Sequence, residues 1–213
     1  MGKKVEKSYN LAVIDIGSPR LDRLGWSLID VSKNEEYHGK ELDELIALTS
    51  VFLEARGLLL GLEAPLFVPV RKCLKSITKA RKGEGRYPWS GGAGAQVLVI
   101  NLPIMVYLFK KLKQKISGLK FILEEDNFSG SAREILLFEA LVSGSNKGNS
   151  HIHDAQIMAN YCLEFAMKKE LPTNILEYEQ ETDFFNLAAA ALLQSESISS
   201  VDTLSKPSPI YKP

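Results

Sequence analysis

The chain has 213 residues, of which 45% are hydrophobic and 24% charged, which is ordinary for a soluble globular protein. Its 26 basic residues balance its 26 acidic residues, so no overall charge attracts the protein to nucleic acid, and any such contact must come from a local basic patch. Two widely separated cysteines, Cys73 and Cys162, exclude a disulfide framework and a zinc site built on cysteine.

The N-terminal part of the chain predicts several strands and one helix. Residues 11–14 are a short apolar run that ends at a turn containing Gly and Pro, and residues 25–31 alternate in polarity, so together they predict a β-hairpin. A third strand is predicted over residues 35–39. Apolar residues recur at helical spacing over residues 41–56, and the run Leu-Leu-Leu-Gly-Leu at 58–62 predicts a buried strand.

The remaining chain begins with an irregular segment over residues 68–94, which is rich in Lys, Arg and Gly. A long apolar helix is predicted over 95–116, with lysines near its C-terminal end that suit the helix dipole. Residues 131–142 fit either a helix or a strand, and we interpret them as a helix. The other predicted elements are a strand over 119–124, a helix over 151–169, a strand over 174–179 and a helix over 183–194.

This alternation of buried strands and helices predicts an α/β fold, a mixed sheet with helices on both faces. No linker rich in Pro, Ser or Gly interrupts the chain before residue 195, so residues 1–194 are predicted to form a single domain. Residues 195–213 are rich in Ser and Pro and contain few apolar side chains. They are predicted to form a flexible C-terminal tail.

A cytoplasmic protein without a membrane anchor is the expectation from the remaining sequence signals. The N-terminal lysines are followed by a strand pattern that contains an aspartate, and not by the apolar stretch of a signal peptide. The longest apolar run, residues 97–109, is interrupted by Asn101 and Pro103 and is too short to cross a bilayer.

Three acidic residues occupy positions where the sequence predicts burial. Asp15 ends the first strand, Glu63 ends the most apolar strand, and Asp154 begins a helix whose apolar residues follow it at i+3, i+4, i+7 and i+8. Taken singly, they could be a turn aspartate, a strand-end acid that reaches water and an acid that suits a helix dipole. Two strand ends and one helix start can, however, meet at one edge of a sheet. Carboxylates gathered there repel one another unless a divalent cation such as Mg²⁺ or Mn²⁺ lies between them.

These motifs resemble those of a known superfamily. The sequences Ile-Asp-Ile-Gly-Ser at 14–18 and Gly-Trp-Ser-Leu-Ile at 25–29 resemble the first hairpin of RNase H-like nucleases, including the Holliday-junction resolvase branch. Glu63 in Gly-Leu-Glu-Ala-Pro is similar to the acid that ends their fourth strand, and His-Asp-Ala at 153–155 to their terminal Asp-Ala helix. The order of motifs over residues 10–169 also resembles a bacterial and archaeal family of predicted RNase H-like nucleases.

The resemblance implies that Asp15, Glu63 and Asp154 are catalytic and hold two Mg²⁺ or Mn²⁺ ions that promote hydrolysis of a phosphodiester bond in DNA or RNA. These enzymes often have a fourth acid, for which Glu124 and Glu139 are the candidates. Glu124, at the end of a predicted strand, is the one that we assign as a further metal ligand.

Two other positions bear on this expected activity. His151 or His153 could assist proton transfer, and we take His153, the neighbour of Asp154, as the catalytic candidate. The second aspartate that follows the first in the terminal helix of these nucleases is absent, because positions 157 and 158 are Ile and Met.

Basic residues concentrate between positions 71 and 86, where Glu84 is the only acid. The resembling family carries a basic segment at the same place, after its Glu-Ala-Pro-type motif. We interpret this segment as a strip that contacts phosphates, with Trp89 available to stack on a base, although a solvated helix and loop would have the same composition. The residues predicted to bind nucleic acid are Lys72, Lys75, Lys79, Arg81, Lys82, Arg86 and Trp89.

The glycine-rich segment 90–94 precedes the long helix and could contact a phosphate, but it lacks the Gly-Lys-Ser/Thr of a P-loop and is interpreted as a flexible hinge. Two alternatives to a nuclease stay open: an inactive nucleic-acid-binding or scaffold protein of the same fold, and a phosphotransferase of the actin-like branch, which shares the Asp-x-Gly motif. The second would need a late glycine-rich phosphate-binding hairpin, and the sequence contains no glycine after Gly148.

Overall fold

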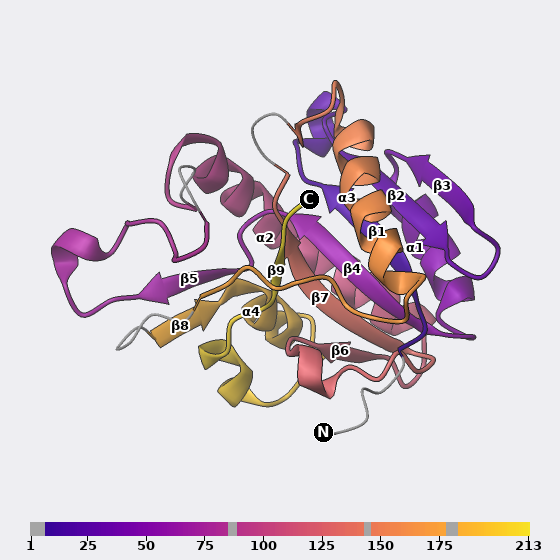
Figure 1. Cartoon of the computed structure of the whole chain (residues 1–213). Helices are drawn as coiled ribbons and strands as arrows, with labels where there is room; N and C mark the ends of the chain where they lie inside the picture. The colour runs from indigo at the N-terminus through magenta and orange to yellow at the C-terminus, as the bar shows by residue number, and fades with distance from the viewer. Residues whose placement is uncertain (1–6, 85–88, 143–145, 178–182) are drawn as a thin grey trace.

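A seven-stranded mixed sheet forms the centre of the structure, a computed structural model that describes residues 7–84, 89–142, 146–177 and 183–213 (Figure 1). In spatial order its strands are β3 (Glu35–Gly39), β2 (Gly25–Asp30), β1 (Tyr9–Asp15), β4 (Gly57–Glu63), β7 (Glu134–Ala140) and β6 (Lys120–Ile122), and β9 (Ile210–Tyr211) pairs with the end of β7. The first three strands pair antiparallel, whereas β1, β4, β7 and β6 are mutually parallel.

Helices cover both faces of this sheet, so the predicted α/β fold is confirmed. They are α1 (Leu42–Phe52), α2 (Gly92–Lys115), α3 (His151–Ala166) and α4 (Leu187–Gln194). In the view of Figure 1, α3 crosses in front of β1 and β2, against which it packs. The other three helices share one hydrophobic core on the opposite face.

Strand β1 shows how the sequence produces these two cores. Successive side chains of a strand point to opposite faces of the sheet. Leu11 and Val13 therefore pack in the core under α3, whereas Ala12 and Ile14 pack in the core under α1, α2 and α4. Because β1 is buried on both sides, it contains an uninterrupted apolar run and places its terminal Asp15 at a protected edge.

The segment predicted as a helix over residues 131–142 is instead β7, which lies between β4 and β6 in the sheet. The interpretation as a helix was wrong because Ile-Leu-Leu-Phe is apolar on both faces, as a central parallel strand requires, and such a run has no visible period of two. By contrast, the predicted hairpin, the third strand and the strand over 58–62 correspond to β1, β2, β3 and β4.

A second, two-stranded antiparallel sheet joins β5 (Phe67–Val70) to β8 (Asp183–Asn186). Neither strand was predicted, since β5 lies in the segment expected to be irregular and β8 begins the segment expected to be helical. Residues 174–177 are without regular structure, and the rest of the strand predicted over 174–179 lies outside the described residues. Short 3₁₀ helices cover Pro19–Leu21, Leu74–Ser76, Glu125–Asn127 and Val201–Ser205.

The C-terminal segment 195–213 is not the flexible tail that its composition suggested. It contains β9, which extends the sheet beside the end of β7, and the side chain of Tyr211 is fully buried there. The backbone amide of Glu139 donates to the carbonyl of Pro209, and the amide of Leu141 donates to that of Tyr211. A few apolar residues, Ile210 and Tyr211, are sufficient to fix the segment because they enter the two cores.

Helix α2 is the one described helix that is long and apolar enough to span a membrane. Core helices of globular proteins pass the same test. The buried residues of α2 fall on one stripe, which packs in the core beneath the sheet: Asn101, Ile104, Met105, Leu108, Phe109 and Leu112.

Replacing Tyr211 by Ala is predicted to lower the free energy of unfolding by about 3–5 kcal/mol, because it removes a fully buried ring from the sheet. Urea denaturation measures the change. Tyr107→Ala, at a position that is 40% exposed, serves as the control and is expected to cost about 1 kcal/mol or less. Equal losses in the two variants would show that the C-terminal segment does not contribute to the core.

Candidate metal centre

Three acidic side chains converge at the carboxyl edge of the parallel strands. Asp15 and Glu63 end β1 and β4, where they are paired directly in register. Asp154 lies in the first turn of α3 and is buried. One carboxylate oxygen of each residue lies within 4.8 Å of the others. The three acids singled out in the sequence therefore form one cluster that could hold a metal ion.

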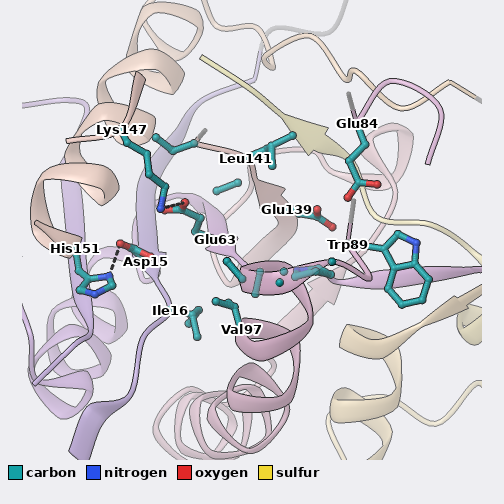
Figure 2. A pocket seen from close by; sticks show the side chains of 18 residues that line it. Asp15, Ile16, Glu63, Glu84, Trp89, Val97, Glu139, Leu141, Lys147 and His151 are labelled. Atoms are coloured by element: carbon teal, nitrogen blue, oxygen red, sulfur yellow. Dashed lines mark hydrogen bonds and ion pairs between the residues drawn. The ribbon is translucent and has the colours of Figure 1, made fainter. Parts of the chain in front are cut away.

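A glycine on β2 allows α3 to approach this cluster. Gly25 is paired with Asp15, and a Cβ atom at Gly25 would lie 2.3 Å from both the carbonyl carbon of His151 and the backbone nitrogen of Ile152. Any side chain there would push the start of α3 away from the sheet. The Ser150 hydroxyl caps the helix at this point by accepting a hydrogen bond from a first-turn amide. The His151 ring is thereby placed with Nδ1 2.6 Å from Oδ2 of Asp15 (Figure 2).

Burial and mutual repulsion disfavour negative charge on the cluster. Asp15 is 4% exposed, and burial raises its pKa although the adjacent His151 acts in the opposite direction. Burial, followed by the charge of Asp15, raises the pKa of Glu63 to about 9. Oε2 of Glu63 is buried and has no hydrogen-bond partner among the described residues. A divalent cation that prefers oxygen ligands would satisfy this atom and offset the repulsion, so the donor set fits such an ion.

Lys147 supplies a positive charge beside the cluster. Its Nζ lies 3.7 Å from Oε1 of Glu63 (Figure 2). The same atom lies 3.9 Å from Oδ2 of Asp154. Both contacts are long and the lysine side chain is 55% exposed, so it can move away at little cost. The next residue, Gly148, donates its amide to Oδ1 of Asp154 at 2.5 Å. Sequence reasoning missed Lys147, because a single lysine in a polar loop carries no signal of its partners.

Two predicted site residues lie away from the cluster. The His153 ring is turned to the preceding loop, where its Nδ1 accepts a hydrogen bond from the Asn149 backbone amide, and His151 is the histidine that contacts Asp15. Glu124 lies beyond the end of β6 and forms an ion pair with Lys206 at 2.7 Å. It does not belong to the acidic cluster, which consists of Asp15, Glu63 and Asp154.

The predicted phosphate contact Arg81 is instead the centre of a buried ion-pair network. Its guanidinium donates to both carboxylate oxygens of Glu139 at 2.5 and 2.8 Å and to Glu84 at 2.9 Å. It also packs over the ring of Phe67, 4.6 Å from the centroid. Arg81 is 3% exposed and cannot reach a nucleic acid. Glu139, the other candidate for a fourth acidic ligand, is committed to this network.

The other predicted basic contacts lie on the surface of the segment that follows β5. Lys72, Lys75, Lys79 and Lys82 are exposed, and Lys82 pairs with Glu177 at 2.6 Å. Arg86 lies outside the described residues. The indole of Trp89 donates to the Lys79 carbonyl, which joins this basic segment to the residues that precede α2.

A cavity of about 660 Å³ opens beside the acidic cluster (Figure 2). Asp15, Glu63, Lys147 and His151 lie at one end of it, and Trp89 and Glu84 lie at the other. Its remaining wall is mostly apolar or glycine: Ile16, Ala64, Pro65, Gly91, Gly92, Ala93, Gly94, Val97, Glu139, Ala140, Leu141 and Val142. The carboxylates are therefore accessible from a space that is large enough for a small organic group.

No protein-family model, no curated protein and no solved structure matches this chain. The function is therefore inferred from the chemistry of the site.

Glu63 is predicted to make the metal-free protein less stable as pH rises. The unfolded chain releases the Glu63 proton near the ordinary pKa of 4.5, whereas the folded protein keeps it up to a pKa of about 9. Between these values the folded state binds more protons, so the free energy of unfolding falls with increasing pH. Glu63→Gln should be more stable than wild type at pH 8 and should lose this part of the pH dependence.

Urea denaturation in EDTA between pH 5.5 and 8.5 tests this prediction, with the exposed Glu164→Gln as a control that should follow wild type. A Glu63→Gln protein whose stability declines with pH as steeply as wild type would contradict the raised pKa.

Arg81→Met is predicted to lower the free energy of unfolding by about 3–5 kcal/mol, since it leaves two buried carboxylates unpaired. Adding Glu84→Gln and Glu139→Gln should restore much of the loss, because no buried charge then remains. Chemical denaturation gives the values. The control is Arg133→Met, which breaks an exposed ion pair with Glu54 and should cost about 1 kcal/mol or less. A triple variant that is no more stable than Arg81→Met alone would argue against charge burial as the cause.

Proposed function

We propose that this protein is a divalent-metal-dependent nuclease that hydrolyses phosphodiester bonds in DNA or RNA. The observation that carries the proposal is the convergence of the Asp15, Glu63 and Asp154 carboxylates within 4.8 Å of one another. Structural ion pairs place opposite charges together, whereas this cluster gathers three like charges in a buried position beside an open cavity. Such an arrangement is costly for folding alone and is useful for holding a cation.

We infer further that the site is of the RNase H-like type. The support is the origin of the three acids, which come from the end of the first strand, the end of the fourth strand and the start of a late helix, in the order that the resemblance implies. The sheet, in which an antiparallel N-terminal meander precedes parallel strands, is compatible with this inference.

Mg²⁺ or Mn²⁺ is the proposed cofactor, held by Asp15, Glu63 and Asp154. When bound there, the metal would supply the Lewis acidity that activates a water molecule and stabilises charge on a leaving oxygen. His151 holds Asp15 in position through its Nδ1 atom, and its ring is 39% exposed. Lys147 can turn from the carboxylates to a phosphate oxygen of the substrate, because its present contacts are long.

Nucleic acid is the proposed substrate, and the exposed lysines after β5 are its proposed backbone contacts. The hydrogen bond from Trp89 to the Lys79 carbonyl supports this proposal, because it joins the backbone of the lysine segment to a residue that lines the cavity. The alternative of an actin-like phosphotransferase is disfavoured, because the sequence has no glycine after Gly148 from which to build a second phosphate-binding hairpin.

Asp15→Asn is predicted to reduce cleavage by at least about 100-fold, since it removes a charge at the reacting centre. Wild type and the variant are compared with labelled single-stranded and double-stranded DNA and RNA, a hybrid duplex and a four-way junction in Mn²⁺. The control is Asp22→Asn, an exposed aspartate paired with Lys40, which should retain full activity.

Calorimetric titration of Mn²⁺ into wild type and Asp15→Asn, in the same buffers, measures metal binding independently of cleavage. Cleavage of at least one substrate and metal binding, both lost in Asp15→Asn, is the expected result. Undiminished cleavage by folded Asp15→Asn protein would refute the role of Asp15. Metal binding without cleavage of any substrate would refute the nuclease and favour a binding protein of the same fold.

A further inference from the structure

The cavity beside the metal centre has two chemically different ends. Carboxylates and Lys147 form one end, and the indole of Trp89 lies at the other (Figure 2). Between them the wall is formed largely by apolar side chains, including Ile16, Val97 and Leu141. A phosphate group would suit the end where a metal could bind, but it would find no partner along the apolar wall.

Hydrogen bonds join the aromatic end of the cavity to the segment that follows β5. The Trp89 indole nitrogen donates to the Lys79 carbonyl at 3.3 Å, and the neighbouring Ser90 hydroxyl donates to the Thr78 carbonyl at 2.5 Å. An indole fixed at the side of a cavity offers a flat face on which a planar ring can stack.

The polar groups inside the cavity exclude an anionic occupant of its apolar part. Glu84 and Glu139 line the wall near Trp89, and both already accept hydrogen bonds from Arg81. One guanidinium shared by two carboxylates leaves a net negative charge beside this wall. That charge favours a neutral ring with N–H donors over a phosphate or an acidic peptide.

The start of α2 leaves room for such a ring. Gly91, Gly92 and Gly94 line the cavity without side chains. Gly92 has a φ of +40°, and a Cβ atom at this position would meet nothing within 4 Å. The glycine is thus required by the backbone conformation, and it keeps this wall of the cavity open.

We propose that this cavity binds one unstacked nucleobase of the substrate, next to the phosphate at the metal centre. The inference rests on the proposed nuclease function and specifies its substrate class as single-stranded, bulged or branched nucleic acid with an unpaired base at the site. A base inside a continuous duplex would first have to be unstacked and unpaired, which costs a few kcal/mol, whereas an unpaired base enters without that cost.

The protein carries its own reporter for this event. It has two tryptophans, of which Trp26 is fully buried in the core and Trp89 lines the cavity. Stacking of a base on Trp89 should therefore quench the accessible part of the intrinsic fluorescence. The full-length Asp15→Asn protein is used in EDTA, so that neither metal nor cleavage enters the measurement.

The probes are an eight-nucleotide single strand, the blunt duplex of the same sequence, and an abasic strand of equal length and charge. The single strand should quench the fluorescence in a saturable manner, and the duplex and the abasic strand should not. Trp89→Ala should weaken binding of the single strand by about tenfold, as expected for the loss of one stacked base. Binding of this variant is followed by fluorescence anisotropy of labelled strands.

Two substitutions on the same helix give a matched comparison. Val97→Phe fills part of the cavity and should weaken binding of the single strand by tenfold or more, whereas Val99→Phe, at a position that is 66% exposed, should leave it unchanged. Circular dichroism verifies that both variants fold.

The inference is overturned if the single strand does not quench the fluorescence, if the abasic strand binds as tightly as the normal strand, or if Val97→Phe and Val99→Phe behave alike. Failure of the base pocket can be distinguished from failure of the nuclease proposal. If wild type cleaves a substrate and Val97→Phe binds the single strand as tightly as wild type, only the base pocket is contradicted. If the protein binds strands in a base-dependent manner but cleaves none of the substrates, only the nuclease proposal is contradicted.

Discussion

The gathering of three buried carboxylates at one sheet edge is the constraint on which the rest of the site depends. Asp15 and Glu63 are neighbours because β1 and β4 are parallel and in register, and Asp154 joins them because Gly25 lets α3 approach closely. Burial and repulsion make this arrangement unfavourable without positive charge. Lys147 lies near two of the carboxylates, and His151 contacts the third. A divalent cation would take over the role of these weaker partners.

A neighbouring acid at the same edge is instead paired with a buried arginine. Glu139 is the penultimate residue of the next parallel strand, β7, where it is paired with Leu62, the residue before Glu63. Both of its oxygens are bound by Arg81, which is itself buried. A carboxylate with such a partner is structural, whereas Glu63 retains a buried oxygen without a partner among the described residues. Arg81 thereby holds the segment after β5 against the sheet, so a residue that looks like a phosphate ligand in the sequence instead shapes the wall of the cavity.

Sequence patterns predicted those features that local periodicity determines. The N-terminal strands, the long helix and the three clustered acids could be predicted because apolar runs end at Asp15 and Glu63 and a helical stripe begins at Asp154. Features that depend on residues far apart in the sequence could not be predicted in this way. The strand β7 was mistaken for a helix, and the segment 195–213 for a tail, because pairing with other strands decides both. The choice between His151 and His153 depended on which ring faces Asp15, and the sequence contains no signal for that.

A crystal structure determined with Mn²⁺, using the anomalous scattering of the metal, would show whether the three carboxylates bind a cation. A peak bounded by carboxylate oxygens of Asp15, Glu63 and Asp154, with the Lys147 ammonium displaced from its contacts, is the result that we predict. A map without a peak at these residues under millimolar Mn²⁺, with Lys147 still beside Glu63 and Asp154, would contradict the metal centre from which the proposed function follows.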